Sequence, residues 1–228
     1  MSESLSPVWL SVATSICATI ITCVAGTALA AWRERRTGAV FAALDGFLIL
    51  PLVLPPTVVG YLLLLLFGRN GPLGRILWSV GVSAVFSWPA TVIAATVVSF
   101  PLMYITARAS FEQIDSDFLD AARTLGASEW RVFRRVALPL AAPGLIAGTV
   151  LSFARALGEF GATLMLAGDI PGKTETLPLA IYFAVEAGEK TRAALGCVID
   201  VVISLALLFA LYGWSRKQFP LRGSGQRG

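Results

Sequence analysis

The sequence predicts an all-α integral membrane protein with about five transmembrane helices. Its 228 residues are 56% hydrophobic and only 14% charged, and the mean hydropathy is +0.76. Soluble domains carry about 25% charged residues. A soluble core of this length does not require such a depletion of charge, so the composition favours a protein of the lipid bilayer.

Five apolar stretches are long enough to cross a bilayer as helices, which takes about 20 residues. They cover residues 8–32, 45–67, 85–107, 144–166 and 197–214. A sixth stretch, 177–185, is too short, and we expect it to lie at the interface or to re-enter the membrane partway. Residues 8–214 then form one transmembrane domain, interrupted by a polar loop at 108–143 and followed by a tail at 215–228.

The distribution of positive charge predicts the orientation of these spans. Of the 18 lysines and arginines, twelve fall in 33–38, in 108–143 and in the tail, five fall in the alternate loops, and Arg155 lies inside a span. Lysine and arginine accumulate on the cytoplasmic side of membrane proteins. We therefore expect the N-terminus outside, the C-terminus inside, and the loop 108–143 in the cytoplasm, where ATP is present.

Several classes of function are disfavoured by composition. The pI of about 9.3 could indicate nucleic-acid binding, but the basic residues cluster beside apolar runs, so we expect contact with membrane lipid and no nucleic acid. There is no histidine, and Cys17, Cys23 and Cys197 lie in apolar segments without CxxC spacing. We expect no catalytic residue, no metal site and no bound cofactor. The N-terminus lacks the basic region of a cleaved signal peptide, so the first apolar run is expected to be retained.

The polar loop 108–143 carries the pattern of two short helices. Asp115-Ser116-Asp117 can cap a first helix by accepting hydrogen bonds from free backbone N–H groups. Phe118, Ala122 and Leu125 then recur at i, i+4 and i+7, which predicts one apolar face. Gly126 is expected to end this helix in a left-handed conformation.

A second short helix is expected to begin at Ser128, with Trp130 and Phe133 on one side. Its arginines are Arg131, Arg134 and Arg135. Pro139 and Pro143 are expected to stop the segment before the fourth span.

Two interpretations of this loop are open. An amphipathic loop could lie on the membrane with its arginines facing anionic lipid. The small residues Ala121, Ala122 and Gly126 favour insertion into a groove of another protein, because they allow a close approach of backbones.

The spacing of the loop resembles the signature of binding-protein-dependent ABC permeases. That signature reads Glu-Ala-Ala, three residues, Gly, nine residues, Ile-x-Leu-Pro. The matching positions here are Asp120, Ala121, Ala122, Arg123 within the first gap, Gly126, Val136, Leu138 and Pro139. Asp replaces Glu and Val replaces Ile, and the shorter carboxylate implies that an ion pair to the ATPase differs in detail.

Two further segments, 51–61 and 153–163, are similar to those of molybdate permeases. Sulfate permeases are similar around 155–161 but are usually longer chains. The resemblance covers residues 8–214 and implies a type I ABC importer permease that carries molybdate. Tungstate is nearly indistinguishable from molybdate, and sulfate or thiosulfate is the main rival substrate.

The resemblance also implies partners. These are a second copy of the chain, two ABC ATPase subunits that use the ATP, and a periplasmic or surface-anchored oxyanion-binding protein. A stand-alone secondary transporter or channel is the alternative from another class, and dependence on an ATPase would discriminate the two. A membrane enzyme is a third class, for which no catalytic constellation is present.

The segment Gly168–Thr174 resembles a phosphate-binding loop but does not fit one. The pattern needs four residues between its glycines, and only three separate Gly168 from Gly172. The segment also follows a transmembrane run and not a strand. We expect a turn that faces the binding protein.

Arg155 and Glu159 lie four residues apart on one face of the fourth span. Counting from Gly144 places Arg155 roughly 17 Å into the span. Charges at this depth indicate function by default. Arg155 could attract a passing oxyanion or could form a structural ion pair. We favour the pair, because the carboxylate cancels much of the attraction and a deep anion well would slow release.

Prolines and glycines interrupt the apolar spans. Pro51, Pro55 and Pro56 interrupt the second span, and the Pro55-Pro56 pair followed by Gly60 could form a gate hinge. Gly144 and Gly148 form a GxxxG pair that predicts close helix packing.

Two acidic residues, Asp45 and Asp200, lie near the ends of predicted spans. We expect both of them to be interfacial.

Overall fold

The computed structural model describes residues 6–34, 36, 38–79, 81 and 84–218, and within α11 the side chains of 207–208 and 210–218 are not among those described. All regular elements in these residues are helices, which confirms the predicted all-α fold. In chain order they are α1 (Ser6–Arg33), α2 (Ala39–Val53), α3 (Pro56–Phe67), α4 (Pro72–Ser79), α5 (Trp88–Glu112), α6 (Ser116–Thr124), α7 (Glu129–Val132), the π-turn η2 (Phe133–Ala137), α8 (Leu138–Leu157), α9 (Gly161–Ala167), α10 (Leu177–Glu186) and α11 (Lys190–Gln218).

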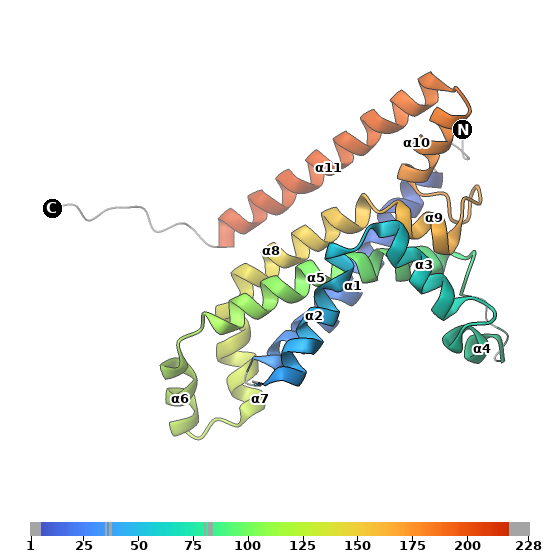
Figure 1. Cartoon of the computed structure of the whole chain (residues 1–228). Coiled ribbons are helices and arrows are strands. Elements are labelled where there is room, and N and C mark those ends of the chain that lie inside the picture. The colour runs from blue at the N-terminus through green and yellow to red at the C-terminus, as the bar shows by residue number, and fades with distance from the viewer. Residues whose placement is uncertain (1–5, 35, 37, 80, 82–83, 219–228) are drawn as a thin grey trace.

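Three long helices, α1, α5 and α8, lie side by side and form the centre of the molecule (Figure 1). Small residues let them approach closely. A Cβ atom at Gly144 would collide with the Ser110 hydroxyl of α5, and one at Gly148 would collide with the Thr106 hydroxyl. The GxxxG pair of α8 therefore packs against α5, as its spacing predicts.

The second predicted span, 45–67, is divided into two helices. α2 and α3 are bent by 117° at a break of two residues, Leu54 and Pro55. Pro55 and Pro56 have no backbone N–H, so an α-helix cannot continue through them with its hydrogen bonds intact. The prediction of prolines interrupting this span is confirmed, but the span is not one straight helix.

The fourth predicted span, 144–166, has different limits. A continuous helical segment runs from Glu129 to Leu157 through α7, η2 and α8. The expectation that Pro139 and Pro143 stop the segment was wrong, because Pro139 lies in the first turn of α8 and Pro143 is accommodated inside it. The helix ends instead at Gly158, and α9 follows as a separate short helix.

The last two helices leave the central bundle. α10 covers the short apolar stretch 177–185, and α11 covers the predicted fifth span but begins earlier, at Lys190. α11 packs against α10 and, more weakly, against α8, and it diverges from the bundle (Figure 1). Its last turn includes 215–218 of the predicted tail, whereas 219–228 lie outside the described residues.

Three helices of the described chain are long and apolar enough to span a membrane, or four if the bent pair α2–α3 counts as one span. The predicted total of five and the predicted orientation stay predictions.

Candidate functional site

The polar loop folds into a two-helix segment at one end of the bundle (Figure 1). We call residues Asp115–Ala137, which comprise α6, α7 and η2, the elbow. The Asp115 side chain accepts a hydrogen bond of 3.0 Å from the backbone N–H of Asp117, which confirms the predicted N-cap.

Gly126 ends α6 as predicted. Its φ is +79°, in the left-handed region. The Gly126 N–H donates to the carbonyl of Arg123, and the Ala127 N–H donates to the carbonyl of Ala122. These two bonds form a Schellman motif and satisfy carbonyls that the helix end leaves free.

The buried side of α6 differs from the predicted apolar face. Leu119 is buried, together with Val132 of α7, in a cluster with Tyr104 and Phe111 of α5. Ala122 packs on the edge of this cluster, whereas Phe118 is 61% exposed and Leu125 is 89% exposed. The predicted apolar face of Phe118, Ala122 and Leu125 is therefore mostly turned away from the core, and α6 packs on the bundle through Leu119 instead.

Arg123 joins the two helices of the elbow. Its guanidinium donates to the Asp120 carboxylate on α6 and, from Nε, to Oε1 of Glu129 on α7 at 2.7 Å. The hydrogen bond to Glu129, and next that to Asp120, raise the pKa of Arg123, so it stays charged. Asp120 and Arg123, which both fall in the signature spacing, are thus engaged with each other.

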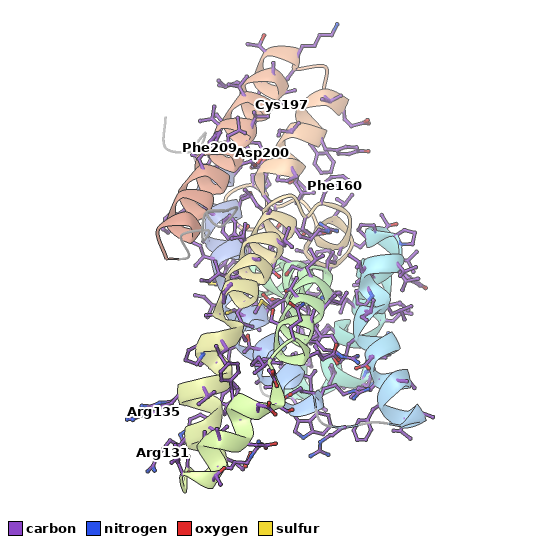
Figure 2. All side chains as sticks on the ribbon, turned by 90° about the vertical axis from the view of Figure 1, so that its left-hand side faces the viewer. Arg131, Arg135, Phe160, Cys197, Asp200 and Phe209 are labelled. Carbon is purple, nitrogen blue, oxygen red and sulfur yellow. The ribbon has the colours of Figure 1, made fainter. Side chains whose placement is uncertain are left out.

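The outer surface of the elbow carries exposed apolar and basic side chains. Phe118, Leu125 and Trp130 are exposed there, Trp130 to 66%. Arg131 and Arg135 project away from the bundle (Figure 2).

A π-turn joins the elbow to α8. The Leu138 N–H donates to the carbonyl of Phe133, five residues back, in place of the usual four. Pro139 follows directly and cannot donate a hydrogen bond to the preceding turn. Turns of this kind occur often at functional sites. Leu138 and Pro139 of the signature therefore mark the point where the π-turn passes into α8.

A buried charge cluster lies beside the elbow, and the sequence interpretation missed it. Arg33 of α1 donates to both carboxylate oxygens of Asp45, at 3.1 and 2.9 Å. Tyr104 and Arg108 of α5 donate to the same carboxylate. Asp45 is 8% exposed, so it is buried among helices, and its interfacial depth stays a prediction. The signal was a lone carboxylate at the edge of an apolar run.

Arg155 and Glu159 form the predicted ion pair. Arg155 Nη1 lies 2.8 Å from Oε2 of Glu159, whose side chain is 1% exposed. Oε1 of Glu159 accepts a hydrogen bond of 2.7 Å from the backbone N–H of Ala162. Glu159 lies just beyond the end of α8, so the pair joins α8 to the beginning of α9.

The predicted hinge residues lie against the same region. Gly161 of α9 packs on Pro56 and Thr57, and Gly60 of α3 packs so closely on Ala162 that an added Cβ would lie 2.7 Å from the Ala162 Cα. The structure thus brings Pro55, Pro56 and Gly60 together with Glu159, at a distance along the bundle from the elbow (Figure 1). The backbone bend is at Leu54 and Pro55, whereas Gly60 lies inside α3.

The segment 168–176 joins α9 to α10. The Thr174 hydroxyl donates to the carbonyl of Gly168 and accepts from the Ile170 N–H, both at 3.0 Å, so it stabilises its own turn. Burial raises the pKa of Asp169 and of Glu175, and the nearby Asp169 charge raises that of Glu175 further. Arg192 of α11 lies 3.9 Å from Glu175.

Among the described residues, no group of three or more histidine, cysteine, aspartate or glutamate side chains is placed to hold a metal ion. The site is therefore one of contacts and charges between helices.

Comparison with known proteins assigns the chain to a family. Residues 23–219 match the family described as binding-protein-dependent transport system inner membrane component. The chain belongs to this family. As a binding-protein-dependent permease it is an inner-membrane protein that works with an ATPase and a substrate-binding protein, and it is not itself an enzyme.

Individual relatives are similar over most of the chain. The molybdenum transport system permease protein ModB of Escherichia coli (strain K12) is 50% identical over 169 residues, which are 73% of this chain and 74% of that protein. ModB of Haemophilus influenzae is 45% identical over 184 residues, 80% of each chain.

Among solved structures, a bacterial ABC transporter involved in the import of the acidic polysaccharide alginate has a similar fold. Its TM-score is 0.79 at 16% identity, with 95% of this chain and 80% of that chain covered. The fold is that of the type I ABC importer permeases.

Proposed function

We propose that this permease carries molybdate through the membrane as part of an ATP-driven importer. The observation that carries the proposal is the substrate named for its relatives at 45–50% identity over most of the chain. The secondary-transporter alternative is not favoured, because the family depends on binding proteins. The chain is proposed to bind no cofactor, and ATP is used by the partner subunit.

The elbow is proposed to be the docking element for the ATPase. Its exposed Phe118, Leu125 and Trp130 form an apolar surface with no cover in the described chain, and exposed apolar groups of this kind mark interaction sites. The ion pairs of Arg123 with Asp120 and Glu129 hold α6 and α7 together, so that a displacement of one helix moves both. Leu119 and Val132 transmit the push to α5.

The transport cycle follows from this arrangement. ATP-driven closure of two ATPase subunits draws two elbows together and opens the pathway to the outside, where the binding protein delivers molybdate. Hydrolysis returns the pathway to the inward-open state. Two copies of the permease are proposed to enclose the route at their interface, because one chain has too few spans to surround a polar pathway by itself.

Arg155 and Glu159 are proposed to act as a structural pair rather than as an anion station. Glu159 uses one carboxylate oxygen on Arg155 and the other on the Ala162 N–H, which leaves little free positive charge for a substrate. Selectivity then lies mainly in the binding protein. Arg155→Ala is expected to weaken the α8–α9 junction without changing the preference among oxyanions, which uptake competition measures.

Reconstitution tests the proposed function. The permease, its ATPase and its binding protein are placed in liposomes, and uptake of labelled molybdate is competed with tungstate, sulfate and thiosulfate. Uptake that requires both ATP and the binding protein and is blocked by excess molybdate supports the proposal. Uptake that sulfate blocks equally well assigns the rival substrate, and uptake by the permease alone, driven by an ion gradient, overturns the importer.

A paired substitution tests the docking surface. Phe118→Ala with Leu125→Ala removes apolar area that this chain does not use, so the fold is expected to persist while co-purification of the ATPase falls. Leu119→Ala is the matched control that destabilises the permease itself, because Leu119 is buried. Unchanged co-purification of the ATPase with the double variant would instead favour the elbow as a lipid-facing loop.

A further inference from the structure

One carboxylate holds three helices together next to the elbow. Asp45 of α2 is bound by Arg33 of α1 and by Tyr104 and Arg108 of α5. Tyr104 is fully buried, and the Arg33 and Asp45 side chains are 7% and 11% exposed. Charge-assisted bonds in such a desolvated setting are stronger and more directional than neutral ones.

Asp45 is the polar attachment of α2 to the rest of the chain, and Leu48 and Ile49 add partly buried apolar contacts. Of the fifteen residues of α2, all of which the structure describes, Asp45 alone is buried. α2 packs chiefly on α5. Its other end borders an apolar groove of about 760 Å³ between α2, α3 and α5.

The charge cluster around Asp45 lies next to the elbow. Tyr104 belongs to the same buried cluster as Leu119, Val132 and Ala137, the buried residues that anchor the elbow. Only three residues, Gln113–Asp115, separate the end of α5 from α6. A displacement of the elbow therefore reaches the partners of Asp45 through packed side chains.

The far end of α2 leads to the other predicted site. It continues through the bend at Leu54 and Pro55 into α3, which packs on α9 next to Glu159. We infer that Asp45 is a positioning residue for transport: it ties α2, and through α2 the α2–α3 bend, to the elbow. This inference rests on the proposed function of the elbow as the ATPase-docking element.

The chain offers a matched control. Arg108 also donates to Glu112 at 2.6 Å, but both residues lie on α5, so this pair joins no two helices. Glu112→Gln removes a charge from the same cluster and leaves the tie between α2 and α5 in place.

The first experiment measures molybdate uptake and ATP hydrolysis together in liposomes that hold the complete transporter. Asp45→Asn is expected to lower the number of molybdate ions carried per ATP by about tenfold or more, because it leaves the buried Arg33 without its counter-ion. Asp45→Glu should recover part of this ratio, and Glu112→Gln should keep the wild-type ratio. A wild-type ratio for Asp45→Asn, or a parallel loss of uptake and hydrolysis with no change in the ratio, overturns the inference.

Milder variants decide the matter if Asp45→Asn fails to assemble. Tyr104→Phe removes one hydrogen bond to Asp45 and keeps the buried ring, and Arg108→Gln removes one charge whose side chain is 30% exposed. Both are expected to lower the ratio of uptake to hydrolysis while the complex still forms. If both keep the wild-type ratio, the inference fails.

A distance measurement separates this inference from the proposed function. Spin labels at two exposed positions of one permease copy, Val40 on α2 and Ser116 at the start of α6, report whether the two move together, once Cys17, Cys23 and Cys197 are replaced by alanine. In the wild type the distribution of label-to-label distances should stay narrow with and without trapped nucleotide. In Tyr104→Phe or Asp45→Asn this distribution should broaden. If the wild-type transporter carries no molybdate, the proposed substrate is refuted. If the distance distribution stays narrow in these variants, the proposed role of Asp45 is refuted.

Discussion

Single residues fix the shape of the elbow. Asp115 begins α6, Gly126 ends it with a φ of +79°, and Arg123 then holds the chain that follows by its bond to Glu129. Each of the three positions provides hydrogen bonds to backbone or charged groups that would otherwise need water as a partner. Local chemistry therefore accounts for part of the signature spacing, and the proposed contact with the ATPase would account for the exposed positions.

Gly126→Ala is expected to destabilise the elbow by about 1–2 kcal/mol, because a residue with a Cβ is disfavoured in the left-handed conformation. No atom lies within 4 Å of the position that this Cβ would take, so the cost is that of the backbone alone. Gly126→Asn should lose less, since asparagine tolerates this conformation. Thermal unfolding of the purified permease measures both, and equal losses for alanine and asparagine would point to a steric cause instead.

The raised pKa values of Asp169 and Glu175 predict that the stability of the protein depends on pH. Burial raises the pKa of both groups, so the folded protein holds their protons to a higher pH than the unfolded chain does. Their contribution to stability is present below the unfolded pKa of about 4 and is lost as the pH rises through the folded pKa.

Asp169→Asn removes this ionisation and is expected to raise the melting temperature at neutral pH relative to wild type. The gain should vanish as the pH falls toward about 4, where the wild-type carboxyl is protonated. Melting curves across pH test this, with Glu186→Gln on the exposed surface of α10 as the control. A lower melting temperature for Asp169→Asn at every pH would contradict the expected sign.

At the scale of helices, breaks and close contacts define the site. α2 and α3 meet at 117°, α8 and α9 are separated at Gly158–Phe160, and the elbow joins α8 through the π-turn. Phe160 marks the second break, and its ring lies 5.0 Å from that of Tyr182 on α10 (Figure 2). Helices that break in this way can change their relative angle without unfolding.

Gly60→Ala is expected to destabilise the α3–α9 contact by about 1–3 kcal/mol, the usual cost of overpacking. The new Cβ would meet the backbone of Ala162, which cannot rotate away. Gly46→Ala is the matched control: it also lies inside a helix but has no neighbour within 4 Å, so it should be neutral or stabilising by up to about 1 kcal/mol. Unfolding of the two variants in the same detergent checks the difference, and equal stabilities would mean that α3 and α9 separate easily.

Much of this architecture could be predicted from the sequence. The positions of the apolar runs, the cap at Asp115, the end of α6 at Gly126 and the Arg155–Glu159 pair follow from periodicity and local bonding. The burial of Leu119 in place of Phe118 could not be predicted, because it depends on the angle at which α6 meets α5. The cluster around Asp45 joins residues as far apart as Arg33 and Arg108, and no local pattern specifies such a contact.

For Pro139 the sequence was misleading. Proline disfavours a helix interior in general, yet the π-turn before it removes the conflict and lets the helix continue.

The whole molecule has two distinct ends. The elbow lies at one end, and α9, α10 and the segment 168–176 lie at the other (Figure 1). The positive-inside rule predicts that the elbow end is cytoplasmic. If the prediction holds, the elbow end is the one near ATP, and the end with α9 and α10 is the one near the binding protein.

Labelling of single cysteines tests this orientation, after Cys17, Cys23 and Cys197 are replaced. Leu125→Cys at the elbow should react with a membrane-impermeant maleimide only after the cells are opened. Lys173→Cys, at an exposed position of the segment 168–176, should react in intact cells. Reaction of Leu125→Cys in intact cells would reverse the orientation and remove the elbow from ATP.

The bend between α2 and α3 has a consequence for solvation. Since the nitrogens of Pro55 and Pro56 carry no hydrogen, the carbonyl oxygens of Pro51 and Leu52 lack the donors that an unbroken helix would give them. Hydrocarbon offers no replacement, and a bare carbonyl there is costly. The bend therefore leaves two backbone carbonyls without their helical donors, and these oxygens need water or a donor from outside α2 and α3.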